Sequence, residues 1–345
     1  MHPWVVSEYP DGVRLLQAAE CEPLAVRWLW RHWLPSGAIT ILAGMPGTGK
    51  TTLALSIASI VSSAGAWPDG TPCIEAGNVV IWSGEDDIQA TLLPRLIAMG
   101  ADRSRVHFVT SIHDQGRFRE FDPSTDIRQL MLKIAEIGGA RLVIIDPILN
   151  AVSGDAHRAN DVRRDLHDLV VLARSEVAVI GISHFSKGGG KAPQHPLDRV
   201  IGSQAFAALA RIVLVTAQSM GEEGRVLARA KSNLGPDGSG FEYVVESLTI
   251  SDSIETSRVV WRGALEGDAR EILGQAEQAM RPPSRMEEAK TFLLDLLVGH
   301  GHLPSVQVLE LAASAGHSAS TIHRAKAELQ IRAEKDGHGG WYWRL

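Results

Sequence analysis

The sequence predicts an α/β domain with a mostly parallel central sheet, followed by a small domain built around three helices. Short apolar runs alternate with stretches of helical periodicity over residues 38–209. This alternation is typical of parallel strands joined by helical crossovers. A break containing two prolines, at residues 281–285, then separates this part from three more helical stretches. We therefore predict an α/β domain at 1–280, a linker at 281–285 and a second domain at 286–345.

The first strand, the loop after it and the following helix form the most informative stretch. Residues 38–43 are apolar and predict the strand, 44–51 read GMPGTGKT, and 52–58 continue as a helix. This order is typical of a P-loop, in which backbone N–H groups and the positive helix end hold phosphates. Lys50 is expected to reach the outer phosphates and Thr51 to bind Mg²⁺. The predicted nucleotide-binding residues are Gly44, Met45, Pro46, Gly47, Thr48, Gly49, Lys50, Thr51 and Thr52.

The next strands are apolar throughout, which indicates burial on both faces of a sheet. The second strand ends in the acidic sequence Gly-Glu-Asp-Asp, and two later strands end in Asp146 and His184. In chain order we predict strand 77–83, helix 88–99 with a kink or restart at Pro94, strand 106–109, helix 125–137, strand 141–147, helix 161–174 and strand 178–183.

The last part of the α/β domain changes character. Residues 185–196 are rich in glycine and proline and predict a loop, followed by a helix at 201–209. The apolar runs 212–216 and 225–231 are separated by short turns, so antiparallel hairpins are expected to complete the sheet as far as about residue 262.

ATP hydrolysis needs carboxylates as well as a phosphate cradle, because the attacking water must be oriented. Asp146 closes an apolar strand and is assigned to the Mg²⁺ shell beside Thr51, the Walker B role. Many P-loop ATPases place the catalytic glutamate directly after this aspartate, but Pro147 stands there. Glu85, at the end of the second strand, is therefore the predicted catalytic carboxylate. The alternative is that it is an ordinary solvated turn residue.

These motifs together resemble the RecA/DnaB superfamily, most closely the RepA-like hexameric helicase ATPases of plasmids and phages, over about residues 20–262. The resemblance implies a RecA-like fold, ATP and Mg²⁺ as cofactors, and a ring or hexamer of identical subunits acting on DNA, with single-stranded DNA as the expected form. It implies that His184 senses the γ-phosphate and that the loop after it contacts DNA through Lys187 and Lys191. The alternatives are that His184 is a strand-end histidine hydrogen-bonded to neighbouring backbone, and that the loop after it is a flexible connection.

The resemblance also implies a basic residue that completes the ATP site of a neighbouring subunit. The candidates are Lys231, Arg229 and Arg211, at strand ends late in the domain. The segment after Lys231 resembles the Lys-x-Arg strand end of DnaB-type proteins, but Asn233 occupies the arginine position. The choice among the three candidates therefore stays open, with ordinary strand-end charges as the alternative.

The C-terminal segment predicts a winged helix-turn-helix, from helices 286–297, 305–315 and 319–328 and a terminal hairpin. Hydroxyl and basic residues at the start of the third helix suit contacts with DNA. Acidic neighbours dilute the basic character, and winged helices also serve as protein docking modules. The candidate DNA-binding residues are Arg324, Lys326, Arg332 and Lys335.

The bulk composition limits the possible classes. A formal net charge of −6 and a pI near 6.1 exclude a surface coated in basic residues, so any nucleic-acid contact must be a local patch. The 2 cysteines exclude a disulfide framework, and no apolar run approaches the ~20 residues that span a bilayer. We expect a cytoplasmic protein with no membrane contact. A tryptophan cluster at residues 28–33 is expected to pack in the core rather than to stack on a nucleotide base.

The sequence thus predicts an ATP-hydrolysing DNA motor or DNA-remodelling ATPase, of the replicative helicase type that the resemblance implies. Two other classes remain open. One is a DNA-binding regulator switched by ATP, and the other is an assembly ATPase of the KaiC kind that forms nucleotide-dependent rings without acting on DNA.

Overall fold

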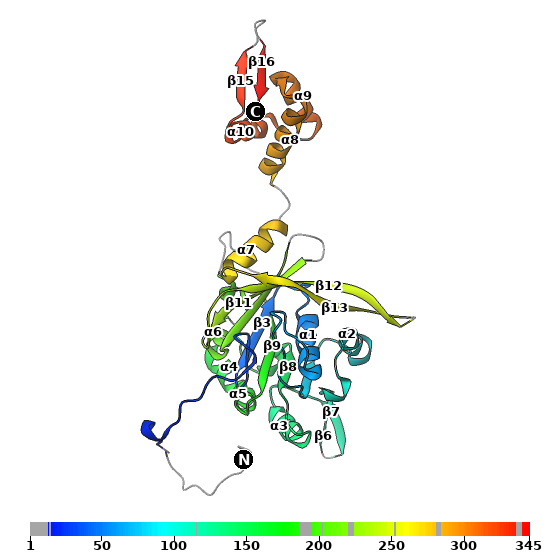
Figure 1. The fold of residues 1–345 in the computed structure, drawn as a ribbon, viewed down its shortest axis with the longest axis vertical. Coiled ribbons are helices and arrows are strands. Elements are labelled where there is room, and N and C mark those ends of the chain that lie inside the picture. The colour runs from blue at the N-terminus through cyan, green and yellow to red at the C-terminus, as the bar shows by residue number, and fades with distance from the viewer. Residues whose placement is uncertain are drawn as a thin grey trace. The chain divides into compact units, whose positions relative to one another are not determined.

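The computed structural model describes residue 13 and residues 15–114, 116–156, 158–186, 195–201, 203–219, 224–251, 253–280, 284–335 and 340–345. The chain divides into two compact units, Met1–Met280 and Arg281–Leu345 (Figure 1). Each unit has its own hydrophobic core and is described separately below.

The first unit is built on a nine-stranded sheet (Figure 1) with the order β13-β12-β11-β10-β3-β9-β8-β4-β5. From β10 to β5 neighbouring strands are parallel, whereas β11, β12 and β13 join by antiparallel pairing. The predicted α/β fold with a mostly parallel sheet is confirmed. The bounds are β3 Ile39–Gly44, β4 Val79–Ser83, β5 Val106–Phe108, β8 Leu142–Asp146, β9 Ala178–His184, β10 Ile212–Gln218, β11 Gly224–Ser232, β12 Gly240–Ser251 and β13 Ile254–Leu265.

Helices cover both faces of this sheet because its strands are apolar on both faces. Along β3, Ile39 and Ile41 pack into one cluster with α3 to α7, while Leu42 packs into the other with α1 and α2. Period-two alternation of strand side chains thus supplies two cores from one strand. The helices are α1 Lys50–Ser63, α2 Leu93–Ala98, α3 Ile127–Glu136, α4 Ala159–Asp165, α5 His167–Arg174, α6 Ser203–Leu209 and α7 Ala269–Met280.

The tryptophan cluster near the start of the described chain packs into the core, as expected. β1 (Trp28–Trp30) and β2 (Leu34–Pro35) form a small hairpin there. The Trp30 side chain is fully buried, with its ring centroid 5.0 Å from that of Trp33 and 5.1 Å from that of Trp67. These rings bury apolar area against Phe241 and Trp261 of the antiparallel strands.

Three local features differ from the sequence-based expectation. The helix predicted at 88–99 is a π-helical turn, Ile88–Leu92, followed by α2. Pro94 has no N–H to donate to the preceding turn, which is consistent with this irregular start. The helix predicted at 161–174 is divided into α4 and α5. The hairpin of β6 (Ser111–Asp114) and β7 (Arg117–Glu120) was not predicted, because its mostly exposed strands lack a buried apolar face.

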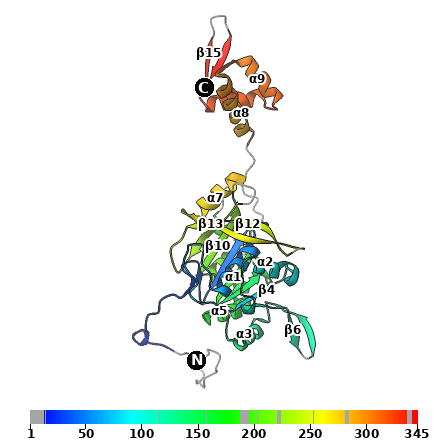
Figure 2. The same cartoon turned by 45° about the vertical axis from the view of Figure 1, so that its right-hand side comes forward.

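The antiparallel part of the sheet ends in a long hairpin. β12 and β13 contain 12 residues each, and Figure 1 shows their outer ends extending beyond the other strands of the nine-stranded sheet, which Figure 2 shows from a second direction. Tyr243 and Trp261 of this hairpin pack with α1 in the core. Farther out on the same face, the apolar side chains are replaced by Ser247, Ser257 and other polar residues.

In its described residues, 284–335 and 340–345, the second unit contains three helices and a three-stranded antiparallel sheet of order β14-β16-β15. The bounds are α8 Arg285–His300, β14 His302–Pro304, α9 Ser305–Ser314, α10 Ala319–Glu328, β15 Arg332–Lys335 and β16 Trp341–Arg344. Ser284 and Glu287 form a capping box at the start of α8. The short strand β14 was not predicted. Its three residues are too few to show strand periodicity.

None of the helices in the described part of the chain is long and apolar enough to cross a membrane. Both cysteines are free thiols, with Cys21 exposed and Cys73 buried.

Candidate nucleotide site

The parallel strands bring the predicted catalytic residues to one edge of the sheet. Gly44 at the end of β3 is in register with His184 at the end of β9. Ser83 at the end of β4 is in register with Asp146 at the end of β8, and Glu85 follows two residues later. The carboxyl edge of a parallel sheet is the usual place for a ligand site in open α/β folds.

The glycine loop between β3 and α1 has the backbone conformation of a phosphate cradle. Gly49 is left-handed, with φ of +76°, and caps α1, which begins at Lys50. A side chain is strained at such a φ, so glycine is required there. At Gly44 an added Cβ would lie 2.2 Å from Thr216 Oγ1, so the neighbouring strand also excludes a side chain. Free N–H groups at the start of α1 face the place that phosphates would occupy.

Lys50 bridges the two ends of this loop. Its Nζ donates to the carbonyl oxygens of Gly44 at 3.2 Å and Met45 at 3.0 Å. Burial lowers the pKa of Lys50, while the charges of Asp146 and Glu85 act in the opposite direction. Among the described residues, the direct partners of this buried ammonium are backbone carbonyl dipoles, and a phosphate would be a stronger partner.

Thr51 and Asp146 form the pair expected at a Mg²⁺ site. Thr51 Oγ1 donates to Asp146 Oδ2 at 2.7 Å, and Asp146 is 4% exposed. Burial is the main cause that raises the pKa of Asp146 to about 6, and the charges of Glu85 and Asp86 add to it. The carboxyl group is therefore mostly ionised above that pH. Its burial beside other carboxylates favours a cation.

The donor chemistry of this pair fits Mg²⁺. Hydroxyl and carboxylate oxygens are ligands of this ion, which usually keeps several waters and binds substrate phosphates rather than an all-protein cage. The described residues contain no group of three or more His, Cys, Asp or Glu side chains that could enclose a metal. Thr51 and Asp146 are the residues that would hold Mg²⁺ here.

Glu85 and His184 flank this pair. Glu85 is exposed, and its charge acts on Lys50, Asp146 and His184 alike. Burial lowers the pKa of His184, the Lys50 charge acts in the same direction, and Glu85 opposes them. His184 Nδ1 is buried and has no hydrogen-bond partner among the described residues. A neutral imidazole is thus favoured next to the phosphate cradle.

The candidates for the neighbouring subunit's site lie at the opposite edge of the sheet. Arg211 directly precedes β10 and is exposed. Lys231 pairs in register with Val213, near the start of β10, and its Nζ donates to Ala210 O at 3.0 Å. Neither can reach the P-loop of its own subunit, because the length of the strand separates the two edges.

Arg229 is placed differently from the other two candidates. It is 3% exposed and donates to His32 O at 3.0 Å and to Ser239 Oγ at 3.1 Å. Its guanidinium also lies 4.7 Å from the ring centroid of Trp33. These contacts are within its own subunit, which argues against an intersubunit role for Arg229.

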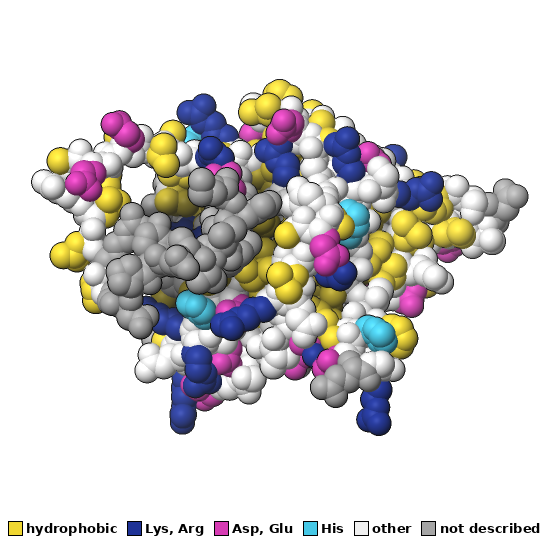
Figure 3. All heavy atoms as spheres, turned by 90° about the horizontal axis from the view of Figure 1, so that it is seen from below, with side chains coloured by type: hydrophobic (Ala, Val, Ile, Leu, Met, Phe, Trp, Pro, Cys, Tyr) yellow, Lys and Arg dark blue, Asp and Glu magenta, His cyan; other side chains and the backbone are white. Residues whose placement is uncertain are grey.

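The candidate DNA contacts are only partly described. Lys187 and Lys191 lie outside the described residues. In the second unit Arg324 and Arg332 are exposed, whereas Lys326 and Lys335 lie over tryptophan rings, at 5.2 Å and 6.0 Å from the centroids. Figure 3 shows basic and acidic side chains intermixed on one face of the molecule, in keeping with the net charge of −6.

Sequence reasoning missed the residues that hold the glycine loop from the antiparallel side. Tyr243 OH donates to Thr48 O at 2.8 Å, and Thr48 Oγ1 lies 2.8 Å from Thr216 Oγ1. An added Cβ at Gly49 would lie 3.0 Å from Val245 Cγ2. These partners stand more than 160 positions later in the sequence, and no local pattern marks them.

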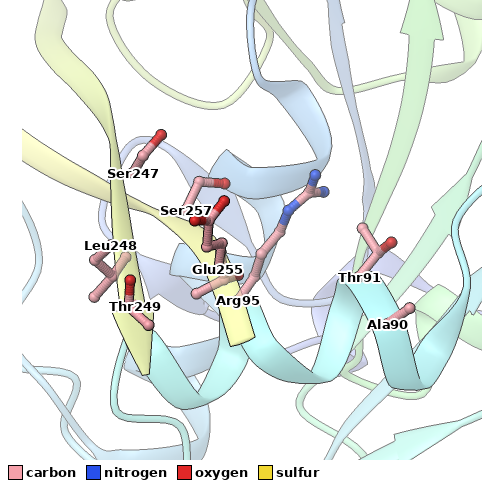
Figure 4. Close-up of a pocket in the computed structure, with 9 residues that line it drawn as sticks. Ala90, Thr91, Arg95, Ser247, Leu248, Thr249, Glu255 and Ser257 are labelled. Atoms are coloured by element: carbon pink, nitrogen blue, oxygen red, sulfur yellow. The ribbon is translucent and has the colours of Figure 1, made fainter. Parts of the chain in front are cut away.

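A polar groove of about 510 Å³ lies beside the site, between the π-helical turn with α2 and the outer part of the β12–β13 hairpin (Figure 4). Arg95 on α2 lines it and pairs with Asp86 at 3.3 Å, in the loop that carries Glu85. Its polar side chains on the hairpin are Ser247, Thr249, Glu255, Thr256 and Ser257. Two features link the groove to the sheet edge that carries Glu85 and Asp146. One is the Arg95–Asp86 ion pair. The other is strand β12, which lines the groove at Ser247 and hydrogen-bonds to the glycine loop through Tyr243.

The mostly parallel sheet, the glycine loop and the Thr51–Asp146 pair together are the features of a P-loop nucleotide-binding domain. Residues 7–190 match the model of the family described as AAA domain, more than half of the 345 residues, and the chain belongs to that family. No curated protein matches the chain. Among solved structures, the crystal structure of the RadB recombinase is similar with a TM-score of 0.42 and 16% identity, covering 64% of this chain and 90% of that chain.

Proposed function

We propose that this protein is an ATP- and Mg²⁺-dependent DNA motor or DNA-remodelling ATPase that acts as a ring of identical subunits, of the RepA-like replicative helicase type. The observation that carries the proposal is the arrangement at the carboxyl edge of the sheet. Lys50 and the Thr51–Asp146 pair face the phosphate cradle, while the carboxylate available to orient water comes from the neighbouring strand, at Glu85. Pro147 excludes the alternative position directly after Asp146.

Each residue has a distinct role in this proposal. The N–H groups of residues 44–51 bind the phosphates, and Lys50 moves from the loop carbonyls to the outer phosphates. Mg²⁺, when bound, neutralises phosphate charge. Glu85 accepts a proton from the attacking water. His184 is favoured in its neutral form, and its buried Nδ1 has no hydrogen-bond partner in the part of the chain that the structure describes. In this proposal it responds to the γ-phosphate and passes its state to the loop that follows β9.

The groove beside α2 is proposed to hold the nucleoside end of ATP. Val245 Cγ2 would lie 3.0 Å from a Cβ added at Gly49, and Ser247, two residues farther along β12, points to the same face and lines the groove. Two residues of a strand span about 7 Å, which sets the distance from the loop to the groove. Hydroxyl side chains and Glu255 offer partners for a ribose and a base. Phosphates bound at the glycine loop would not extend into the groove.

Filling the groove should separate nucleoside from phosphate recognition. Ser257→Phe is expected to weaken ATP binding roughly tenfold, about 1.4 kcal/mol, and to leave binding of inorganic triphosphate unchanged. Arg258→Phe is the matched control, since Arg258 points to the other face of β13 and pairs there with Glu246. Calorimetric titration with both ligands measures the effect. Equal losses for ATP and triphosphate would contradict a nucleoside subsite.

The motor activity is tested by DNA-dependent turnover. Single-stranded DNA should stimulate ATP hydrolysis by the whole chain at least about fivefold, because a DNA-coupled ring changes the site when DNA binds. Mass measurement with and without ATP should show a ring, and tailed duplexes should report strand displacement. Turnover that ignores DNA, in a protein that binds none, would refute the proposal.

A second function is favoured by the separate C-terminal unit with its own core. In this case the protein is a DNA-binding regulator that uses ATP as a switch, and the second unit is a winged helix that recognises duplex DNA. This alternative predicts slow hydrolysis and specific duplex binding that is lost when residues after Ser284 are removed.

A further inference from the structure

The three-stranded sheet of the second unit has one face turned away from the core. Leu303 and Trp343 point into that core. The alternate residues of the same strands therefore point to the opposite face. The register places Arg344 directly opposite both His302 and Arg332. These three exposed side chains form one row across β14, β16 and β15, called the basic row below.

A hollow of about 580 Å³ lies beside the basic row. It is lined by Gly301, His302, Glu334, Lys335, Tyr342 and Arg344. The Tyr342 ring lies 5.7 Å from the ring of His302, centroid to centroid, so an aromatic surface adjoins the positive charges. Proteins that bind nucleic-acid strands combine basic side chains, which contact phosphates, with aromatic side chains, which contact bases.

The basic row has no ion-pair partner among the described residues, although Glu334 lies on the same face of β15 and lines the hollow. Arg332 and Arg344 make no ion pair with any residue that the structure describes. They lie directly opposite each other on the neighbouring strands β15 and β16. Other basic residues of this unit do have partners: Lys290 pairs with Glu328 at 2.5 Å, and Lys326 lies over a tryptophan ring. Like charges placed directly opposite destabilise a sheet. A ligand with closely spaced negative charges would remove that repulsion.

We propose that the basic row binds the phosphodiester backbone of a DNA strand, with Tyr342 in contact with a base or sugar beside it. Two strand spacings make the row about 10 Å long, which suits two or three successive phosphates. This inference rests on the proposed DNA-related function. It assigns the main contact to the exposed sheet face, where the sequence already predicts Arg332 as a DNA contact, and it adds His302 and Arg344 to that residue. Two other predicted contacts, Arg324 and Lys326, lie on α10.

Arg332→Glu tests this assignment most sharply. It removes a phosphate contact and at the same time places a carboxylate opposite Arg344, which replaces a repulsion by an attraction. With the whole chain and a fluorescent single-stranded oligonucleotide, we expect affinity to fall at least about tenfold. The slope of log affinity against log salt, measured from about 50 to 200 mM, should decrease by about 0.7 to 1. The thermal midpoint of unfolding should stay the same or rise.

Two matched variants complete the test. Arg332→Lys keeps the charge and should retain affinity within about threefold. Arg285→Glu makes the same charge change at an exposed position of α8 and should also retain it. The assignment is overturned if Arg332→Glu leaves affinity and salt slope unchanged, if Arg285→Glu loses as much, or if Arg324→Glu loses as much, since the last result places the contact on α10.

The same preparations separate this inference from the proposed motor function. DNA-stimulated ATP turnover is measured alongside DNA affinity. Wild-type protein that binds DNA through the basic row without stimulated turnover would refute the motor and support the row. If Arg332→Glu changes neither the DNA affinity nor the stimulation of ATP turnover by DNA, DNA binding by the basic row is refuted and the motor function stays supported.

Discussion

Replacing Lys50 with alanine is expected to abolish tight ATP binding and, with it, hydrolysis. The Nζ lies buried at the glycine loop with two carbonyl oxygens as partners, and no other cation contacts these carbonyls among the described residues. Charged hydrogen bonds to phosphate contribute about 1.5–3 kcal/mol each, so losing two should weaken ATP binding by at least about 100-fold. Calorimetry or a fluorescent ATP analogue measures this loss.

The stability of the Lys50→Ala variant should not suffer in the same way. Because burial lowers the pKa of Lys50, the folded protein holds this ammonium at a cost, and its removal relieves that cost. Lys133→Ala is the control, since Lys133 is exposed on α3 and pairs with the neighbouring Glu136 at 2.5 Å. An Lys50→Ala protein that binds ATP within a few-fold of wild type would show that the loop is not the phosphate site.

Replacing Glu85 with glutamine is expected to keep ATP bound while turnover falls by about 10²–10⁴-fold, the usual range for loss of a general base. Glutamine has nearly the same shape, so the loop after β4 should be preserved. The charge of Glu85 raises the pKa of Asp146, so its removal lets Asp146 ionise at a lower pH. The substitution should therefore not weaken the Mg²⁺ site.

Single-turnover hydrolysis measured beside ATP affinity separates these two effects. Asp87→Asn is the matched control, because Asp87 is exposed two positions away and its side chain caps the π-helical turn by accepting from Ala90 N at 2.6 Å. Asparagine is an equally good cap, so turnover should stay within about twofold. Full turnover in the Glu85→Gln protein would move the proton-accepting role to another residue.

The two expected results describe different parts of one site. Loss at Lys50 removes binding, whereas loss at Glu85 removes the chemical step. A switched regulator needs ATP binding alone, whereas a motor also needs the chemical step. Measuring both variants together with DNA-dependent turnover therefore distinguishes a motor from a switched regulator. The Glu85→Gln protein is also suited to ring and DNA-binding measurements, since it should hold ATP without consuming it.

The sequence by itself determined the parts that depend on local pattern. The strand, glycine loop and helix around Lys50 are marked by residue types that the backbone conformation requires, such as the left-handed Gly49. Apolar strands ending in Glu85, Asp146 and His184 could be aligned in advance, because parallel strands place their carboxyl ends at one edge. The fold class followed from the same alternation of strands and helices.

Only the tertiary structure decided which distant side chains meet. Tyr243 and Thr216 hold the glycine loop from antiparallel strands, and no short-range periodicity connects them to it. Burial of Arg229 against Trp33 separates it from the exposed Arg211, although both looked like strand-end charges. The local sequence pattern limits the structural and chemical roles that are open to each residue. Strand register and packing, which depend on contacts far apart in the chain, decide which of these possibilities are used.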